Sequence, residues 1–109
     1  MYHYRAPIHD MNFLLTNMSQ TQAQNPDLDE LKMVLEQASK FTEQELAPAN
    51  GPGDVEGCKF SSGSVSLPNA TRTAFENYVK AGWMGICMPE NWGGQDLPEI
   101  IGSKVGEMI

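Results

Sequence analysis

Two carboxylates near the carboxyl end are the first side chains of this 109-residue chain that could do chemistry. Glu90 stands in the segment MPENWGG, and Glu107 is followed only by Met108 and Ile109. A carboxylate whose pKa is tuned by its surroundings can take a proton from a substrate or return one. Both glutamates are therefore candidate acid or base groups, to be weighed against surface or structural roles.

Two histidines and two cysteines are the candidates for a metal site. They are His3, His9, Cys58 and Cys87. Their spacing matches no zinc pattern, and two cysteines make no disulfide framework. We predict no metal site and free thiols, as is usual in the reducing cytoplasm. The amino terminus lacks a basic region followed by an apolar run, so we expect no signal peptide and a cytoplasmic location.

Two tryptophans, Trp83 and Trp92, could cover a ligand. We expect them instead to be buried anchors whose indole N–H groups are hydrogen-bonded. The glycine pairs nearby form neither a GxGxxG motif nor a phosphate loop with its lysine. No phosphate-binding loop is therefore predicted.

The charge balance excludes one class of partner and leaves others open. The chain has 7 Lys and Arg against 14 Asp and Glu, a net charge of −7, which argues against binding nucleic acid. Charged residues are only 19% of the chain, which indicates that some surface is covered by more protein. No apolar stretch approaches the roughly 18 residues of a membrane span.

The amino-terminal part is predicted to be an extension, residues 1–26, that carries one short helix. Residues 1–9 should form an extended arm, and Asp10 is a suitable N-cap for a helix over residues 11–18. Residues 19–25 are polar and predict a loop. The rest, residues 27–109, forms a second unit.

The second unit begins with the most regular helical pattern of the chain. Pro26 and Asp27 open it, and Pro48 is expected to end it at Ala47. Turn residues then fill positions 50–57, and positions 58–67 predict a small hairpin. The apolar positions of the helix form one stripe: Leu28, Leu31, Val34, Leu35, Ala38, Phe41 and Leu46.

Two more helices and a shaped loop complete the pattern. A helix over residues 68–81 should turn Ala74, Phe75, Tyr78 and Val79 inward, with Gly82 at its C′ position. Residues 81–98, rich in Trp, Gly and Pro, form a shaped loop. Pro98 then starts a helix whose Gly102 and Gly106 we expect to face a close backbone. Its pattern stops at Ile109 without a cap, which we interpret as an incomplete helix.

Three blocks of this sequence together resemble acyl-CoA dehydrogenases. The first is Tyr4-Arg5-Ala6-Pro7 with Asp10-Met11 and Phe13-Leu14-Leu15, which resembles an amino-terminal extension of one branch that includes 3-methylmercaptopropionyl-CoA dehydrogenases. The second is Leu46-Ala47-Pro48, Asn50, Gly53-Asp54 and Gly57-Cys58. The third is Ala81-Gly82-Trp83, Pro89-Glu90, Trp92-Gly93-Gly94-Gln95, Leu97-Pro98 and Glu107-Met108.

The resemblance implies a fold and an activity. The fold is mainly α: a partial amino-terminal helical domain with three to four helices and a small hairpin. The full-length family uses FAD to introduce an α,β double bond into acyl-CoA thioesters and passes electrons to an electron-transfer flavoprotein. Family members are expected to be homo-oligomers. By resemblance, the catalytic base lies in a carboxy-terminal bundle beyond this chain.

This resemblance also assigns the candidate residues. Because the family's base is elsewhere, we expect surface or capping duty for Glu90 and a structural hydrogen bond for Glu107. No catalytic or flavin-contact residue is carried over, and no FAD is expected to be held by this chain alone. The sequence thus predicts an inactive portion of a dehydrogenase; the alternative is a stand-alone helical interaction module.

Two positions depart from the family pattern. The family reads Gly-Gly-x-Gly where this chain has Gly93-Gly94-Gln95-Asp96. Aspartate accepts the left-handed backbone less readily than glycine, so the loop geometry is affected. Thr71 replaces a common aromatic residue and leaves the helix over residues 68–81 a thinner apolar face.

Overall fold

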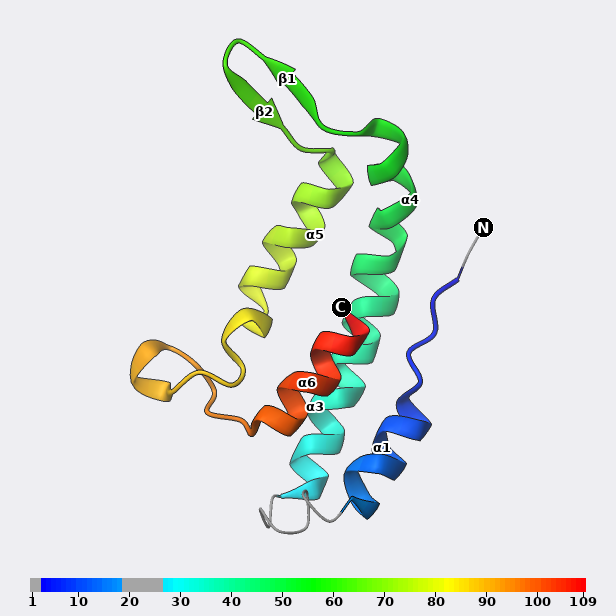
Figure 1. Cartoon of the computed structure of the whole chain (residues 1–109), viewed down its shortest axis with the longest axis vertical. Helices are drawn as coiled ribbons and strands as arrows, with labels where there is room; N and C mark the ends of the chain where they lie inside the picture. Colours follow the sequence, from blue (N-terminus) through cyan, green and yellow to red (C-terminus); the bar gives the residue numbers. More distant parts are fainter. Residues whose placement is uncertain (1–2, 19–26) are drawn as a thin grey trace.

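The computed structural model describes residues 3–18 and 27–109. In these residues the chain forms four helical rods and a two-stranded hairpin (Figure 1). The predicted mainly helical class with a small hairpin is confirmed. The rods are α1 (Ile8–Asn17), a continuous run of α3 (Leu28–Phe41), the π-helix η1 (Thr42–Leu46) and α4 (Ala47–Glu56), then α5 (Asn69–Lys80) and α6 (Glu99–Met108).

The long rod is the axis of the molecule. It begins where the Asp27 side chain accepts a hydrogen bond from the Glu30 amide at 3.2 Å, a standard N-cap. On its outer face Lys40 and Glu36 form an ion pair at 3.1 Å. The predicted apolar stripe is confirmed in α3, where Leu31, Leu35 and Ala38 are buried.

Pro48 does not end this rod, so the predicted helix end at Ala47 is wrong. Pro48 lies in the first turn of α4, directly after the π-helical turn η1. A proline is tolerated in a first turn, and the wider π-turn interrupts the regular α ladder just before it. The predicted turn over residues 50–57 is therefore helical as far as Glu56, and Gly57 with φ of 65° ends the rod.

The amino-terminal helix also begins earlier than predicted. α1 starts at Ile8, after Pro7, and Asp10 lies in its first turn instead of capping it. A carboxylate in the first turn favours the helix through the macrodipole, which explains its position equally well. Of the described residues, 3–7 precede the helix and carry no helix or strand, so the predicted arm over residues 1–9 is shorter at its carboxyl end. The predicted loop over residues 19–25 lies outside the described residues.

The core lies at one end of the rod. It is formed where α1 and α6 pack on α3, and Figure 1 shows α6 crossing in front of α3. α4, by contrast, buries no residue, and α5 buries only Ala74. The molecule is flat, with extents of 54 × 37 × 17 Å. The core residues are Ala6, Met11, Leu15, Leu31, Leu35, Ala38, Ile86, Ile101, Val105 and Met108.

The opposite end of the molecule carries the hairpin and α5. Strands β1 (Lys59–Ser61) and β2 (Ser64–Ser66) are antiparallel, with Phe60 paired to Val65. They confirm the small hairpin predicted within residues 58–67. Gly82 follows α5 with φ of 80°, which confirms its predicted C′ role. The inward face predicted for α5 is wrong in part, because the side chains of Phe75 and Val79 are about half exposed, at 52% and 47%.

The loop between α5 and α6 is held by backbone contacts. It contains two 3₁₀ turns, η2 (Trp83–Gly85) and η3 (Glu90–Trp92). Gly94 lies against the Met88 carbonyl so closely that a Cβ at this position would collide with it. Asp96 has φ of 53°, a left-handed conformation that glycine adopts more readily. The shaped loop predicted here is confirmed.

Across residues 3–18 and 27–109, no helix combines the length and apolar character that crossing a bilayer requires.

Candidate functional site

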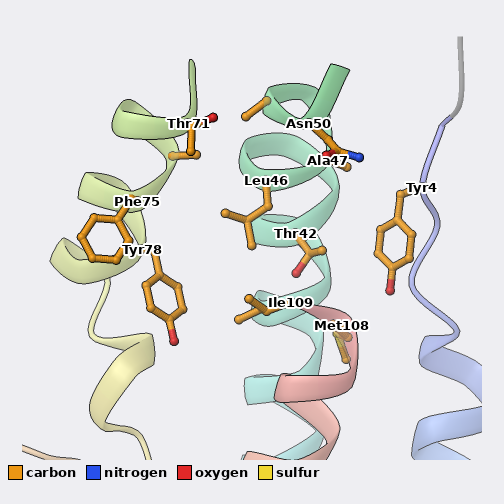
Figure 2. A pocket seen from close by; sticks show the side chains of 12 residues that line it. Tyr4, Thr42, Leu46, Ala47, Asn50, Thr71, Phe75, Tyr78, Met108 and Ile109 are labelled. Atoms are coloured by element: carbon orange, nitrogen blue, oxygen red, sulfur yellow. The ribbon is translucent and has the colours of Figure 1, made fainter. Parts of the chain in front are cut away.

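An open groove of about 630 Å³ lies on the face of the long rod where α6 ends. Figure 2 shows its floor on η1 and α4, one wall on α5 and the opposite wall on the arm that carries Tyr4. The last residues, Met108 and Ile109, close its lower end. The lining consists of Tyr4, Thr42, Leu46, Ala47, Ala49, Asn50, Thr71, Ala74, Phe75, Tyr78, Met108 and Ile109.

Gly53 on α4 and Thr71 on α5 are small residues at the point where these two helices pack against each other. A Cβ at Gly53 of α4 would lie 2.5 Å from Oγ1 of Thr71 on α5, so the two helices approach closely there. Lower down, the Asn77 side chain donates a hydrogen bond to the Glu45 carboxylate at 2.9 Å. The large side chains of Leu46 and Phe75 also line the groove.

The lining is suited to binding an apolar group and has little capacity for chemistry. Its polar groups are the hydroxyls of Tyr4, Thr42, Thr71 and Tyr78 and the amide of Asn50. The Thr42 hydroxyl donates to the Ala38 carbonyl at 2.9 Å and is therefore already engaged. None of the described lining residues is Asp, Glu, His, Lys or Arg. The described lining therefore offers no carboxylate or imidazole as a general base and no cationic side chain for a phosphate.

The two candidate glutamates lie away from the groove. Glu90 is exposed at the start of η3, where its backbone carbonyl accepts a hydrogen bond from the Gly93 amide at 2.9 Å. Glu107 is exposed on α6, and its side chain makes no hydrogen bond within the described residues. Neither glutamate is among the residues that line the groove.

The histidines and cysteines do not form a metal centre. His3, His9 and Cys58 are exposed and Cys87 is half-buried. Among residues 3–18 and 27–109, no group of three or more His, Cys, Asp or Glu side chains is placed to hold a metal ion.

The environment of Cys87 alters the chemistry of its thiol. Burial raises the pKa of the Cys87 thiol, and the nearby Glu99 carboxylate raises it further, while a hydrogen bond with the Gly102 backbone acts in the opposite direction. The thiol lies 3.5 Å from the Pro98 carbonyl oxygen, to which it donates. A thiol with a raised pKa is a poor nucleophile, so Cys87 is a packing residue.

The tryptophans differ from the expectation that both are buried with bonded indoles. Trp92 is 78% exposed. Trp83 is half-buried against Phe41, with ring centroids 6.0 Å apart, but its buried Nε1 has no hydrogen-bond partner among the described residues. Both departures occur in the loop between α5 and α6.

Sequence reasoning did not find the groove. Its floor falls on residues 46–50, which the prediction assigned to a helix end and a turn. The available signal was that Leu46 continues the apolar stripe of α3 and that Ala47 and Ala49 follow as good helix formers. The groove also needs Tyr4 and Ile109, which lie far apart in the sequence, and no local pattern links them.

Two comparisons with known proteins identify relatives of this chain. A model of the acyl-CoA dehydrogenase N-terminal domain matches residues 28–105. The chain is also 30% identical, over 97% of its length, to a 3-methylmercaptopropionyl-CoA dehydrogenase of Ruegeria pomeroyi. It spans 19% of the length of that relative.

Proposed function

Since this chain belongs to the acyl-CoA dehydrogenase family, we propose that it is an amino-terminal portion of a flavin-dependent acyl-CoA dehydrogenase. The reaction of the whole enzyme would be the α,β-dehydrogenation of acyl-CoA thioesters. The observation that carries this proposal is the match over residues 28–105, which runs from the start of α3 into α6. Residues 27–109 would be an incomplete helical domain and residues 1–26 an extension of it.

The catalytic groups of the enzyme would lie outside this chain. The described lining of the groove has no Asp, Glu, His, Lys or Arg side chain, so the groove offers neither a carboxylate base nor a basic side chain for a flavin pyrophosphate. We therefore propose that the chain alone holds no FAD and has no activity. Glu90 and Glu107, both exposed, would have no catalytic role.

The partners of the whole enzyme follow from the family. They would be an acyl-CoA substrate, an electron-transfer flavoprotein as electron acceptor and further copies of the same subunit. The relative's name makes 3-methylmercaptopropionyl-CoA the first substrate to assay. We expect a cytoplasmic location and no role in binding nucleic acid, consistent with the net charge of −7.

The gene sequence downstream of Ile109 tests this proposal. An open reading frame that continues into a β-domain and a carboxy-terminal helical bundle with a glutamate base would support it. A stop codon directly after Ile109, with no such sequence nearby, would contradict it and favour the second candidate.

That second candidate is a stand-alone helical interaction module. The open groove favours it, because its apolar lining could receive a helix from another protein. The two candidates differ in what happens to the isolated chain. A module should be a folded monomer with a cooperative melt, whereas an incomplete domain should be marginally stable and tend to aggregate through its exposed apolar surface.

A further inference from the structure

The amino-terminal arm, residues 3–7, lies along the long rod without a helix or strand of its own. Within the arm, Ala6 is buried in the core, whereas the neighbouring Arg5 is exposed. Tyr4 of the arm forms one wall of the groove (Figure 2). The position of the arm therefore determines whether the groove is closed on that side.

One side chain of the rod bonds the backbone of the arm. The Glu43 carboxylate accepts a hydrogen bond from the Ala6 amide at 2.9 Å, across 37 positions of sequence. The Ala6 carbonyl accepts from the Ile8 amide at 2.8 Å. The amide and the carbonyl of the buried Ala6 are thus both hydrogen-bonded, and the acceptor for the amide is the Glu43 carboxylate. A buried amide that loses its acceptor is costly, and bonds to charged acceptors are the stronger ones.

The π-helical turn supplies this acceptor. Glu43 and Glu45 both belong to η1, and residues two apart on a helix do not face each other. Glu43 reaches the arm, while Glu45 accepts from Asn77 on α5. The same turn thereby fastens both walls of the groove to its floor. π-turns are frequent at functional sites, and here the turn has an identifiable structural task.

We propose that residues 3–7 are a strap that closes the groove on the side of Tyr4, and that the Glu43 carboxylate fastens the backbone of this strap to the rod. Without the Glu43 carboxylate, the strap leaves the rod more often and withdraws Ala6 from the core, while the core contacts among α1, α3 and α6 remain. Tyr4 leaves the groove wall with it, so the groove opens on that side. The strap is a conformational device of the fold and does not depend on whether the chain is part of a dehydrogenase.

The chain contains its own reporter for this opening. Trypsin cleaves after arginine, and the Arg5–Ala6 bond is the peptide unit whose amide Glu43 holds. Cleavage there requires that the strap leave the rod. Arg72, within α5, is the internal reference, because cleavage after it requires α5 to unfold. When opening is fast relative to cleavage, each cleavage rate reports the population of its own open state.

The experiment compares four versions of the 109-residue chain by mass spectrometry of a tryptic time course. In Glu43→Ala we expect cleavage after Arg5 to be about tenfold faster, with cleavage after Arg72 unchanged. Glu43→Gln keeps an acceptor oxygen and should cleave at nearly the wild-type rate. Glu45→Ala removes the neighbouring carboxylate of the same turn and should leave cleavage after Arg5 unchanged.

Three results would overturn the proposal. The first is a Glu43→Ala chain cleaved after Arg5 at the wild-type rate. The second is an equal rise at Arg5 and Arg72, which would mean that Glu43 supports the whole fold and not the strap. The third is a wild-type chain cleaved after Arg5 as fast as a synthetic peptide of residues 1–12, which would mean that no strap is fastened.

Discussion

The sulfur of Cys87 packs against the backbone of Gly102. A Cβ at Gly102 would lie 2.5 Å from the Cys87 Sγ, so no larger residue fits α6 at this position without moving the thiol. Gly106, one turn further along the same helix, has nothing within 4 Å of the position its Cβ would take. The expectation that both glycines face a close backbone is therefore wrong, because Gly102 meets a side chain and Gly106 meets open space.

This difference predicts opposite effects for two matched substitutions. Gly102→Ala should lower the free energy of unfolding by about 1–3 kcal/mol through overpacking. Gly106→Ala should raise it by up to about 1 kcal/mol, because alanine favours the helix and meets no clash. Urea denaturation followed by circular dichroism measures both. The double variant Gly102→Ala with Cys87→Ala should recover part of the lost free energy of unfolding, because the clash with the sulfur is removed. Equal effects of Gly102→Ala and Gly106→Ala would contradict the packing described.

The two cysteines should differ in reactivity. Cys87 is half-buried with a raised pKa, whereas Cys58 is exposed. We expect iodoacetamide to label Cys58 first in the folded chain and both at comparable rates in urea. The single variants Cys58→Ser and Cys87→Ser identify each site by mass. Faster labelling of Cys87 in the folded chain would contradict its burial.

The raised pKa of Cys87 also links stability to pH. The folded chain keeps the thiol proton at pH values where the unfolded chain has released it. The resulting contribution to stability is complete below the thiol pKa of the unfolded chain and declines as pH rises through the folded value. Wild type should therefore lose more stability than Cys87→Ser as pH is raised into the alkaline range. Parallel losses in urea titrations would argue that the thiol is not linked to folding.

Asp96 should be replaceable by glycine with a gain in stability. Its φ of 53° is left-handed, and the family has glycine at this position in its Gly-Gly-x-Gly pattern. Asp96→Gly should raise the free energy of unfolding by about 0.5–1 kcal/mol, whereas Asp96→Ala should lower it. Thermal melts of the two variants and of the wild type measure the order of their stabilities. An alanine variant as stable as the glycine variant would show that this backbone conformation is not strained.

The groove should be the main apolar binding surface of the isolated chain. Phe75 lines it and is 52% exposed, whereas Phe60 is 75% exposed on the hairpin outside it. Phe75→Ser should therefore reduce the fluorescence of a bound apolar dye more than Phe60→Ser does, with little change in stability for either. A larger loss from Phe60→Ser would place the dye at the hairpin.

The elements that the sequence predicts correctly depend on local chemistry. The cap at Asp27, the stripe through Leu31 and Leu35, the hairpin and the C′ glycine at Gly82 each follow from residues within a few positions of one another. Glycine at positive φ and an apolar repeat on one helix face need no distant partner to be recognised.

The errors arise where a local rule competes with its surroundings. Pro48 ends a regular α-helix, but here it follows a π-turn and begins a new one, which no single-residue rule foresees. Phe75 and Val79 have the spacing of a buried face, yet burial needs a partner that the described residues do not supply. The groove depends on Tyr4, Leu46 and Ile109 meeting in space, and such contacts are set by packing.

The most direct test of the account is an activity assay on the purified 109-residue chain. The chain is incubated with FAD, 3-methylmercaptopropionyl-CoA and a dye acceptor, beside the full-length Ruegeria pomeroyi relative as a positive control. We predict no dye reduction by the chain and no flavin retained after gel filtration. Dye reduction that depends on the thioester, or FAD retained at one per chain, would contradict the claim that this helical portion lacks the groups for dehydrogenation.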